Sequence, residues 1–220
     1  MNYPGSKNGE GVWQTIINQI PPHRVYVELF AGSAAILRRK RPAQFNAAVE
    51  IDGQTVDALR IHLPASVSVY HEDGLHWLQQ HPAGADWFIY VDPPYLFETR
   101  RGGEGRIYRY EYGSLIQHNA LLMELRRSKA MVTVSGYRHP VYDDLLHDWR
   151  RLDYTAQTRQ GPATESLWMN YAVPATLHDY AHLGRDRTDR QRIRRKIARL
   201  QSKLAALHPL ERAALLSSVT

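Results

Sequence analysis

Short apolar runs alternate along the chain with stretches whose apolar residues recur every three or four positions. The runs are rich in β-branched and aromatic residues and predict strands at Val25–Leu29, Ala47–Ile51, Val67–Tyr70, Trp87–Val91, Ala130–Ser135 and Ser166–Ala172, with a weaker candidate at Arg151–Gln157. The amphipathic stretches predict helices at about Gly9–Gln19, Ser33–Arg39, Gln54–His62, Leu75–Gln80, Ser114–Arg127 and Val141–Asp148. Strands that alternate with helices predict an α/β fold with a mostly parallel sheet.

Two segments interrupt this alternation. The first, residues 96–113, is rich in Gly, Arg and Tyr and is expected to be a loop. The second, residues 187–207, predicts a long basic helix whose apolar residues recur at spacings of four and three and form a seam over residues 193–207. Pro209 follows, and a short helix is expected at Leu210–Ser217. The seam can pack on the body of the protein or on a second copy in a homodimer.

Composition indicates a globular protein and removes several classes of site. The 220 residues suffice for one domain with a small appendage, and 43% of them are hydrophobic and 23% charged. The absence of cysteine excludes disulfides, thiolate metal sites and a cysteine nucleophile, and the histidines show no metal-ligand spacing. No apolar run is long enough to cross a bilayer, and the first residues lack the apolar stretch of a signal peptide. We therefore expect a cytoplasmic protein without a metal.

The positive charge is concentrated at the C-terminus. The formal net charge is +6 and the pI is about 9.6. Residues 185–220 contain ten basic and three acidic residues, so the rest of the chain carries a slight excess of acid. This asymmetry predicts a main domain, 1–184, followed by a basic helical extension, 185–220, and it favours a polyanion as partner. For the basic helix itself, phosphate contact and a solvated face carry equal weight.

The sharpest chemical signal is Asp92-Pro93-Pro94-Tyr95, directly after the apolar run Trp87–Val91. Parallel sheets bind ligands at the carboxyl ends of their strands, where this motif falls. The two prolines make the turn rigid. Asp92 and the Pro93 carbonyl can accept hydrogen bonds from an exocyclic amine, and the Tyr95 ring can stack on the planar ring that carries the amine. The alternative interpretation is an ordinary proline turn with a packed tyrosine.

Other strand ends carry residues that suit a nucleoside-containing ligand. Phe30-Ala31-Gly32-Ser33 is a small-residue loop before a predicted helix, where the backbone can approach a ligand closely and a helix end favours an anion. Glu50 ends the second run, 18 residues after the glycine of that loop, and a carboxylate there can bind ribose hydroxyls. Asp73 can cap the next helix, bind an adenine amine, or do both. Lys7, near Tyr3 in the N-terminal stretch, can hold a carboxylate.

These motifs, in this order, resemble those of the Dam-like (alpha) group of DNA adenine-N6 methyltransferases. The resemblance rests on YPGSK, ELFAGSA, VEID, an ED pair before a helix, DPPY, AMVTVSGY and ESLWMNY, and it covers about residues 1–175. It implies a seven-stranded S-adenosylmethionine-dependent methyltransferase sheet with helices on both faces and an antiparallel last strand. It also implies S-adenosylmethionine as methyl donor, with Tyr3, Lys7, Glu50 and Asp92 at donor-binding positions and Asp92 to Tyr95 as the catalytic motif.

Motifs and resemblance together give an expected donor site, which consists of Tyr3, Lys7, Phe30, Ala31, Gly32, Ser33, Glu50, Asp73 and Asp92. The sequence departs from the Dam-like group in two places. Ala34 stands where the group often has a second glycine, which narrows the expected pocket slightly. Only 18 residues separate Asp73 from Asp92, which leaves no room for the target-recognition region of Dam-like enzymes. The chain is therefore more similar to compact, phage-type members, and its sequence specificity is expected to be loose.

Double-stranded DNA is the expected partner, with the target adenine flipped out of the helix. Arginines interleaved with tyrosines in the loop at 96–113 suit phosphate contact and base stacking. The expected DNA-binding residues are Arg100, Arg101, Arg106, Tyr108 and Arg109 in this loop and Arg192, Arg195, Lys196 and Arg199 in the basic helix. Three alternatives stay open: a cytosine N4 acceptor, an RNA adenine acceptor, and a non-catalytic module that binds nucleic acid.

Overall fold

The computed structural model describes residues 5–100, 107–158 and 161–218, so Tyr3, Arg101 and Arg106 lie outside the described residues. The strands are β1 (Val25–Leu29), β2 (Phe45–Glu50), β3 (Val67–His71), β4 (Trp87–Val91), β5 (Met131–Gly136), β6 (Arg150–Thr158) and β7 (Gly161–Met169). The helices are α1 (Val12–Ile17), α2 (Gly53–His62), α3 (Gly74–Gln80), α4 (Leu115–Arg127), α5 (Pro140–Leu145), α6 (Arg187–Ala205) and α7 (Pro209–Ser218), with a short 3-10 turn, η1, at Phe97–Thr99.

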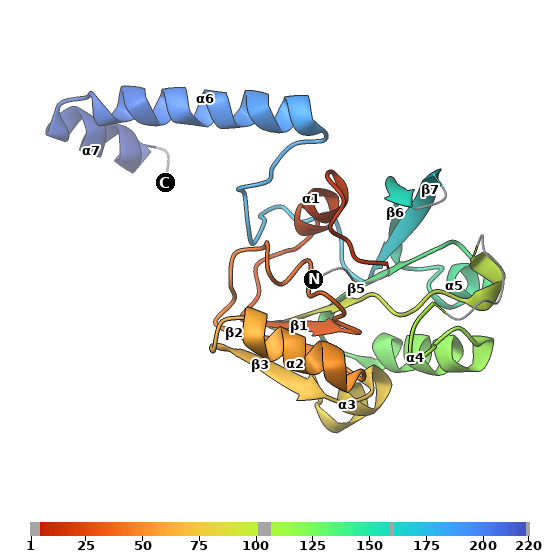
Figure 1. Ribbon diagram of the computed structural model, residues 1–220. Coiled ribbons are helices and arrows are strands. Elements are labelled where there is room, and N and C mark those ends of the chain that lie inside the picture. The colour runs from red at the N-terminus through yellow and green to blue at the C-terminus, as the bar shows by residue number, and fades with distance from the viewer. Residues whose placement is uncertain (1–4, 101–106, 159–160, 219–220) are drawn as a thin grey trace. The chain divides into compact units, whose positions relative to one another are not determined.

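The seven strands form one sheet in the order β3-β2-β1-β4-β5-β7-β6 (Figure 1). Strands β3, β2, β1, β4 and β5 run parallel, whereas β7 pairs antiparallel with both β5 and β6. The mostly parallel sheet with an antiparallel last strand is confirmed. The strand order reverses between β1 and β4, and the carboxyl ends of these two strands are where such sheets bind their ligands.

Side chains of the central strands alternate between two apolar layers. Val27 and Leu29 of β1 join a buried cluster with residues of α3, α4 and α5 on one face. Tyr26, on the opposite face, joins a cluster with residues of α1, α2 and the turns that follow β1. Helices therefore cover both faces, as the sequence predicted, and the polar strand ends are left as the place for a site.

The observed elements follow the predicted ones except after β1. Each predicted strand is present, although β7 begins earlier than expected because it forms a long hairpin with β6. The helix predicted at Ser33–Arg39 is wrong, since residues 32–39 form successive turns. Ala34 has φ 50°, in the left-handed region that a right-handed helix excludes. The small-residue loop therefore does not lead into a helix N-terminus.

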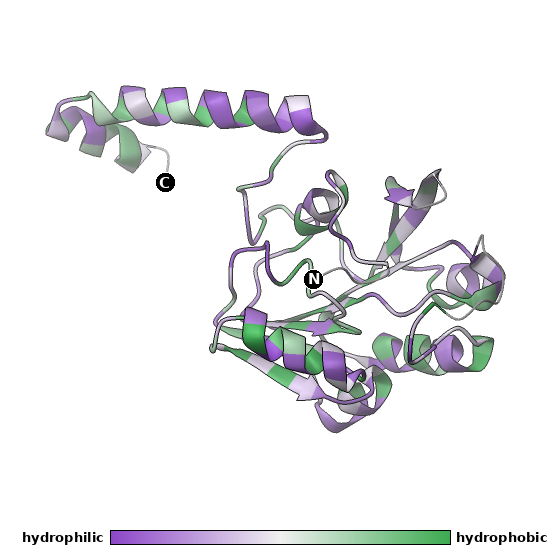
Figure 2. Cartoon of the chain, in the orientation of Figure 1, coloured by the Kyte–Doolittle hydropathy of each residue, from purple (hydrophilic) through white to green (hydrophobic). Residues whose placement is uncertain are grey.

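The chain divides into two compact units, residues 1–179 and 180–220. The first contains the sheet, and the second contains α6 and α7. Asp186 caps α6 by accepting a hydrogen bond from the Asp189 N–H. Figure 2 shows α6 as mostly hydrophilic, with hydrophobic residues recurring along it. Among the described residues, no helix is long and apolar enough to span a membrane.

Candidate active site

A pocket of about 300 Å³ opens at the carboxyl ends of β1, β2 and β4, where the strand order reverses. Its wall contains most of the expected donor residues and the whole of the predicted catalytic motif. These residues are Lys7, Phe30, Ala31, Gly32, Ser33, Glu50, Asp73, Asp92, Pro93, Pro94 and Tyr95. The fold thus brings together motifs that are separated by up to 88 residues in the chain.

The loop after β1 approaches the pocket through strained backbone. Phe30, Gly32 and Ala34 all have positive φ angles of 50–55°. Only the glycine adopts this region without a steric cost, so Ala34, where the Dam-like group often has glycine, is held by its surroundings. The loop is tied to the N-terminal segment by a 2.5 Å hydrogen bond between the hydroxyls of Ser6 and Ser33.

Glu50 and Asp73 occupy the predicted edge of the pocket. The Glu50 carboxylate is buried and accepts hydrogen bonds from the Gly32 N–H (2.8 Å) and the Asp52 N–H (3.0 Å). Burial raises the pKa of Glu50, although these N–H groups oppose the shift. Asp73 caps α3 by accepting from the N–H groups of Leu75 and His76, and it also lines the pocket, so its two proposed roles are compatible.

Glu28 is a pocket residue that sequence reasoning missed. It lies on β1, is 3% exposed, and accepts hydrogen bonds from the Tyr26 hydroxyl and the Leu37 N–H. Burial raises its pKa to about 7, in spite of those two hydrogen bonds. The signal that could have found it is a lone carboxylate inside an otherwise apolar strand.

The DPPY turn (residues 92–95) is fixed by hydrogen bonds to its carbonyls. His118 on α4 lies 3.1 Å from the Pro94 carbonyl, and the Arg100 Nε donates to the Tyr95 carbonyl at 2.8 Å. Burial lowers the pKa of His118 to about 4, so the ring is neutral at neutral pH and uses its Nε2–H to donate. Neither His118 nor this role of Arg100 was predicted.

Lys7 lies against the DPPY turn. Its ammonium donates to both Asp92 oxygens and to the Tyr95 hydroxyl, each at 2.8 Å, and is 3.6 Å from a Glu165 oxygen. Burial raises the pKa of Asp92 to about 6, and the adjacent Lys7 limits that rise. In this structure Lys7 contacts the carboxylate of Asp92, the predicted catalytic residue, whereas the sequence predicted that Lys7 contacts the carboxylate of the donor.

Glu165 and two aromatic residues complete this side of the site, and none of them was predicted. The Glu165 carboxylate, on β7, accepts from the hydroxyls of Tyr95 (2.9 Å) and Tyr154 (2.8 Å). The Tyr137 ring meets the Tyr95 ring edge-on, with centroids 4.7 Å apart. Glu165 is therefore an anchor for the hydroxyl end of Tyr95.

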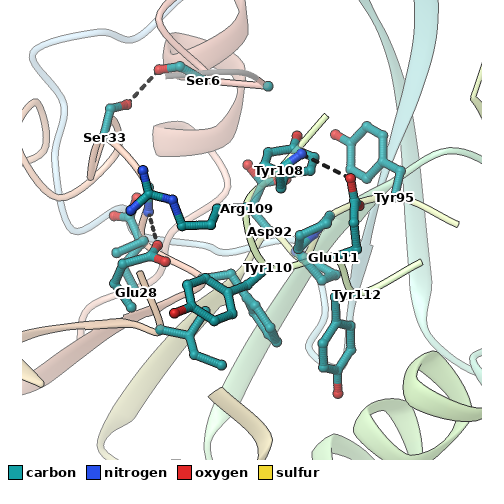
Figure 3. A pocket seen from close by; sticks show the side chains of 18 of the residues that line it. Ser6, Glu28, Ser33, Asp92, Tyr95, Tyr108, Arg109, Tyr110, Glu111 and Tyr112 are labelled. Carbon is teal, nitrogen blue, oxygen red and sulfur yellow. Dashed lines mark hydrogen bonds between the residues drawn. The ribbon is translucent and has the colours of Figure 1, made fainter. Parts of the chain in front are cut away.

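Residues 107–112, which we call the Arg-Tyr segment, contribute residues 108–112 to the wall of the pocket. Glu111 accepts hydrogen bonds from the N–H groups of Ile107 and Tyr108 and from Arg100 Nη2, the last at 2.6 Å. Arg109 reaches across the pocket, donating to Asp52 at 3.2 Å and to Gln54 at 2.7 Å. Figure 3 shows its side chain extending toward the side that carries Glu28 and Ser33.

The predicted DNA-binding residues thus fall into two groups. Arg100 is 8% exposed and is bound by Glu111 and the Tyr95 carbonyl, which leaves it no room for a phosphate in this structure. Tyr108 and Arg109 line the pocket. By contrast, Arg192, Arg195, Lys196 and Arg199 of α6 are exposed and line one shallow groove together. Within the described residues, no cluster of His, Asp and Glu could hold a metal ion.

Comparison with known proteins supports the fold. No protein-family model matches the chain, and no curated protein matches it in sequence. The N-methyltransferase NodS from Bradyrhizobium japonicum WM9 superposes with a TM-score of 0.50 at 10% identity, over 74% of this chain and 94% of NodS. Precorrin 8W decarboxylase from Methanobacterium thermoautotrophicum gives 0.49 at 14% identity, over 77% and 94% of the two chains. The 23S rRNA methyltransferase ErmE gives 0.48 at 13% identity, over 80% and 72%. The chain has the fold of the S-adenosylmethionine-dependent methyltransferases.

Proposed function

We propose that this protein is an S-adenosylmethionine-dependent methyltransferase whose acceptor is N6 of an adenine flipped out of DNA. One observation carries the proposal: the DPPY turn and the carboxylate-bearing ends of β1 and β2 line a single pocket at the reversal of strand order. A cationic donor and an amine acceptor can meet in such a pocket, with one reactant against each wall.

The donor side of the pocket suits a cationic nucleoside. Glu28, Glu50 and Asp73 line it, and carboxylates stabilise a positively charged ligand in a partly desolvated site. The two backbone N–H groups that hold Glu50 fix it at the end of β2, where a carboxylate can accept from ribose hydroxyls. When bound, S-adenosylmethionine supplies an electrophilic methyl group on its sulfonium sulfur. The loop at residues 30–34 lets the backbone approach this ligand closely.

The acceptor side is the DPPY turn. Because the carbonyls of Pro94 and Tyr95 are already hydrogen-bonded, the Pro93 carbonyl and the Asp92 carboxylate are the turn's candidate acceptors for an exocyclic amine. Two acceptors aim the nitrogen lone pair at the methyl group, and the Tyr95 ring stacks on the base. Positioning of this kind supplies most of the acceleration. As the C–N bond forms, the methyl–sulfur bond would break and leave a neutral thioether, and Asp92, with its pKa raised to about 6, can accept the proton that the amine loses.

Nucleic acid binding is assigned to α6. Arg192, Arg195, Lys196 and Arg199 line one groove on the helix, and their exposed side chains can meet successive phosphates. Phosphate contacts carry no sequence information, so we propose loose sequence specificity. The apolar seam of the same helix, with Ile197 and Leu200 exposed, can pair with a second copy.

The test is transfer of radiolabelled methyl groups from S-adenosylmethionine to unmethylated plasmid, followed by identification of the modified nucleoside. We expect N6-methyladenine in many sequence contexts. Asp92→Ala should lower the rate by about 10²-fold or more, because it removes an acceptor at the reacting nitrogen. The matched control is Asp57→Ala on α2, which removes an exposed carboxylate that is not part of the pocket lining and should leave the rate unchanged.

Each of the other outcomes changes a different part of the proposal. N4-methylcytosine would keep the site chemistry and replace the acceptor base. Transfer to RNA in preference to DNA would replace the polymer. Donor binding without transfer to either polymer would favour the non-catalytic nucleic-acid-binding module. Methylation of one short motif to saturation would contradict loose specificity.

A further inference from the structure

The structure presents a conflict at Asp92. The Lys7 ammonium lies 2.8 Å from each Asp92 oxygen, so both oxygens already accept from a cation. A carboxylate that is neutralised in this way is a weak and crowded acceptor for a neutral amine. Each Asp92 oxygen keeps a second lone pair that an amine N–H can use, but release of one oxygen by Lys7 would make Asp92 the stronger acceptor.

Lys7 cannot simply be released, because it is buried. Its side chain is 5% exposed, and an unpaired buried ammonium would cost several kcal/mol. A second anion close to the first would remove this penalty. An alternative partner for Lys7 that lies within reach of a small side-chain shift would therefore favour the proposed reaction.

Glu165 is such a partner. Its Oε2 is 3.6 Å from the Lys7 Nζ, beyond hydrogen-bonding distance but less than an ångström farther than Asp92. Glu165 is 6% exposed and is fixed on β7, where the hydroxyls of Tyr95 and Tyr154 donate to the same oxygen. Tyr95 links Lys7 to Glu165, since its hydroxyl accepts a hydrogen bond from Lys7 and donates one to Glu165.

We propose that Glu165 is a positioning residue that receives the Lys7 ammonium when an acceptor amine binds Asp92. Lys7 then remains paired throughout the cycle, and Asp92 becomes available to the amine. The inference rests on the proposed function, because it requires an amine at Asp92. It adds a role for a β7 carboxylate that lies outside the DPPY motif and outside the residues that line the pocket.

The first test replaces Glu165 with glutamine, which keeps the shape and an acceptor for the tyrosine hydroxyls but removes the charge. With donor saturating and enzyme in excess over DNA, the single-turnover rate of methyl transfer should fall about tenfold or more, the scale expected for a misplaced reacting group. The Kd for the donor should stay within about twofold, since Glu165 does not line the donor side of the pocket. Tyr154→Phe is the matched control: it removes one hydrogen bond to Glu165, keeps the charge, and should cost less than about threefold.

The second test repeats Glu165→Gln in a Lys7→Met background. Without the lysine, Asp92 and Glu165 face each other as like charges, which disfavours the ionised form of Asp92. Glu165→Gln removes that repulsion, so it should speed the variant that lacks Lys7 while it slows the enzyme that has it. Opposite signs in the two backgrounds support the transfer of Lys7 between carboxylates.

A slower rate in both backgrounds would mean that Glu165 only supports the structure, and it would overturn the inference. An unchanged rate for Glu165→Gln in the presence of Lys7 would overturn it as well. Both results leave the proposed function intact, because the parent enzyme still methylates. Failure of the parent enzyme to methylate any polymer would instead overturn the proposed function and this inference together.

Discussion

Two sets of arginines in this protein are candidates for DNA contact, and their surroundings differ. Arg100 precedes the Arg-Tyr segment and Arg109 lies in it. Arg195 and Arg199 lie on α6. The first two are bound by Glu111, Asp52 and Gln54 at the pocket, whereas the α6 pair lines an exposed groove. Arginines interleaved with tyrosines predict a nucleic-acid contact for the first set, whereas for the basic helix phosphate contact and a solvated face carry equal weight. Acidic and polar neighbours engage the first pair inside the protein, whereas the α6 pair is exposed.

The comparison separates two uses of guanidinium groups. At the pocket, Arg100 links the DPPY turn to the Arg-Tyr segment, since it donates to the Tyr95 carbonyl and to Glu111. There the guanidinium of Arg100 holds the DPPY turn and the Arg-Tyr segment together. The side chains of Arg195 and Arg199 on α6 are exposed and contribute little to folding. Variants that remove the same charge at the two places should therefore fail in different assays.

The largest effect is expected for Arg100→Met. The Arg100 side chain is 4% exposed, and its loss would leave Glu111 without its cation, so the free energy of unfolding should fall by about 3–5 kcal/mol. Urea unfolding followed by tryptophan fluorescence measures this. The matched variant Arg195→Met on α6 should change it by less than about 0.5 kcal/mol. Equal losses for the two variants would remove the distinction between the sets.

The second effect concerns DNA affinity. Arg195→Gln/Arg199→Gln should weaken binding and reduce the slope of log K against log salt by about 0.9 for each phosphate that the variant no longer neutralises. The control pair Arg187→Gln/Arg194→Gln removes the same charge from positions outside the groove. Fluorescence anisotropy of a labelled duplex over a salt series measures both slopes. If the two pairs give the same slope, the groove has no special role and only net charge matters.

Acid provides a third way to separate the regions, because the proposed acceptor in the pocket is a carboxylate whereas basic residues line the groove on α6. The pKa of Asp92 is raised to about 6 by burial, and its ionised form is the proposed acceptor, so activity should be present above that pH and fall about tenfold per unit below it. The charged groups that act on Asp92 are Lys7 and Glu165, and Glu28 of the same pocket, whose pKa burial raises to about 7, interacts with it as well. The proposed DNA contact does not use Asp92, so DNA affinity should persist where activity is lost. A parallel loss of binding and activity would place the titrating group elsewhere.

The sequence predicted those parts of the molecule that depend on local pattern. Strand periods located the ends of β1, β2 and β4, and parallel pairing then placed Glu50, Asp73 and Asp92 at one edge of the sheet. The roles of these residues stay predictions until the variants are measured. Periodicity was sufficient to predict their convergence on one pocket.

Long-range partners could not be predicted in the same way. Glu165 looks like an ordinary polar residue in a strand until β7 brings it to Lys7, 158 residues away in the chain. The turns after β1 were mistaken for a helix because Ala34 is a good helix former, and its positive φ is imposed by tertiary packing. The pairing of Arg100 with Glu111 likewise joins residues 11 positions apart that no periodic pattern relates.

The smallest effect is expected for Arg109→Ala, which tests the boundary of the comparison because Arg109 belongs to the pocket set but is half exposed. Its ion pair with Asp52 has side-chain exposures of 52% and 17%, so its loss should change the free energy of unfolding by less than about 1 kcal/mol. Yet Arg109 reaches across the pocket, so donor dissociation, followed by stopped-flow fluorescence, should accelerate several-fold. Asp52→Asn, which weakens the same bridge from the other side, should accelerate it similarly. Donor release could instead be unchanged in both variants while DNA affinity falls for Arg109→Ala alone. Arg109 would then belong with the arginines of α6, and its exposure, rather than its position at the pocket, would determine its role.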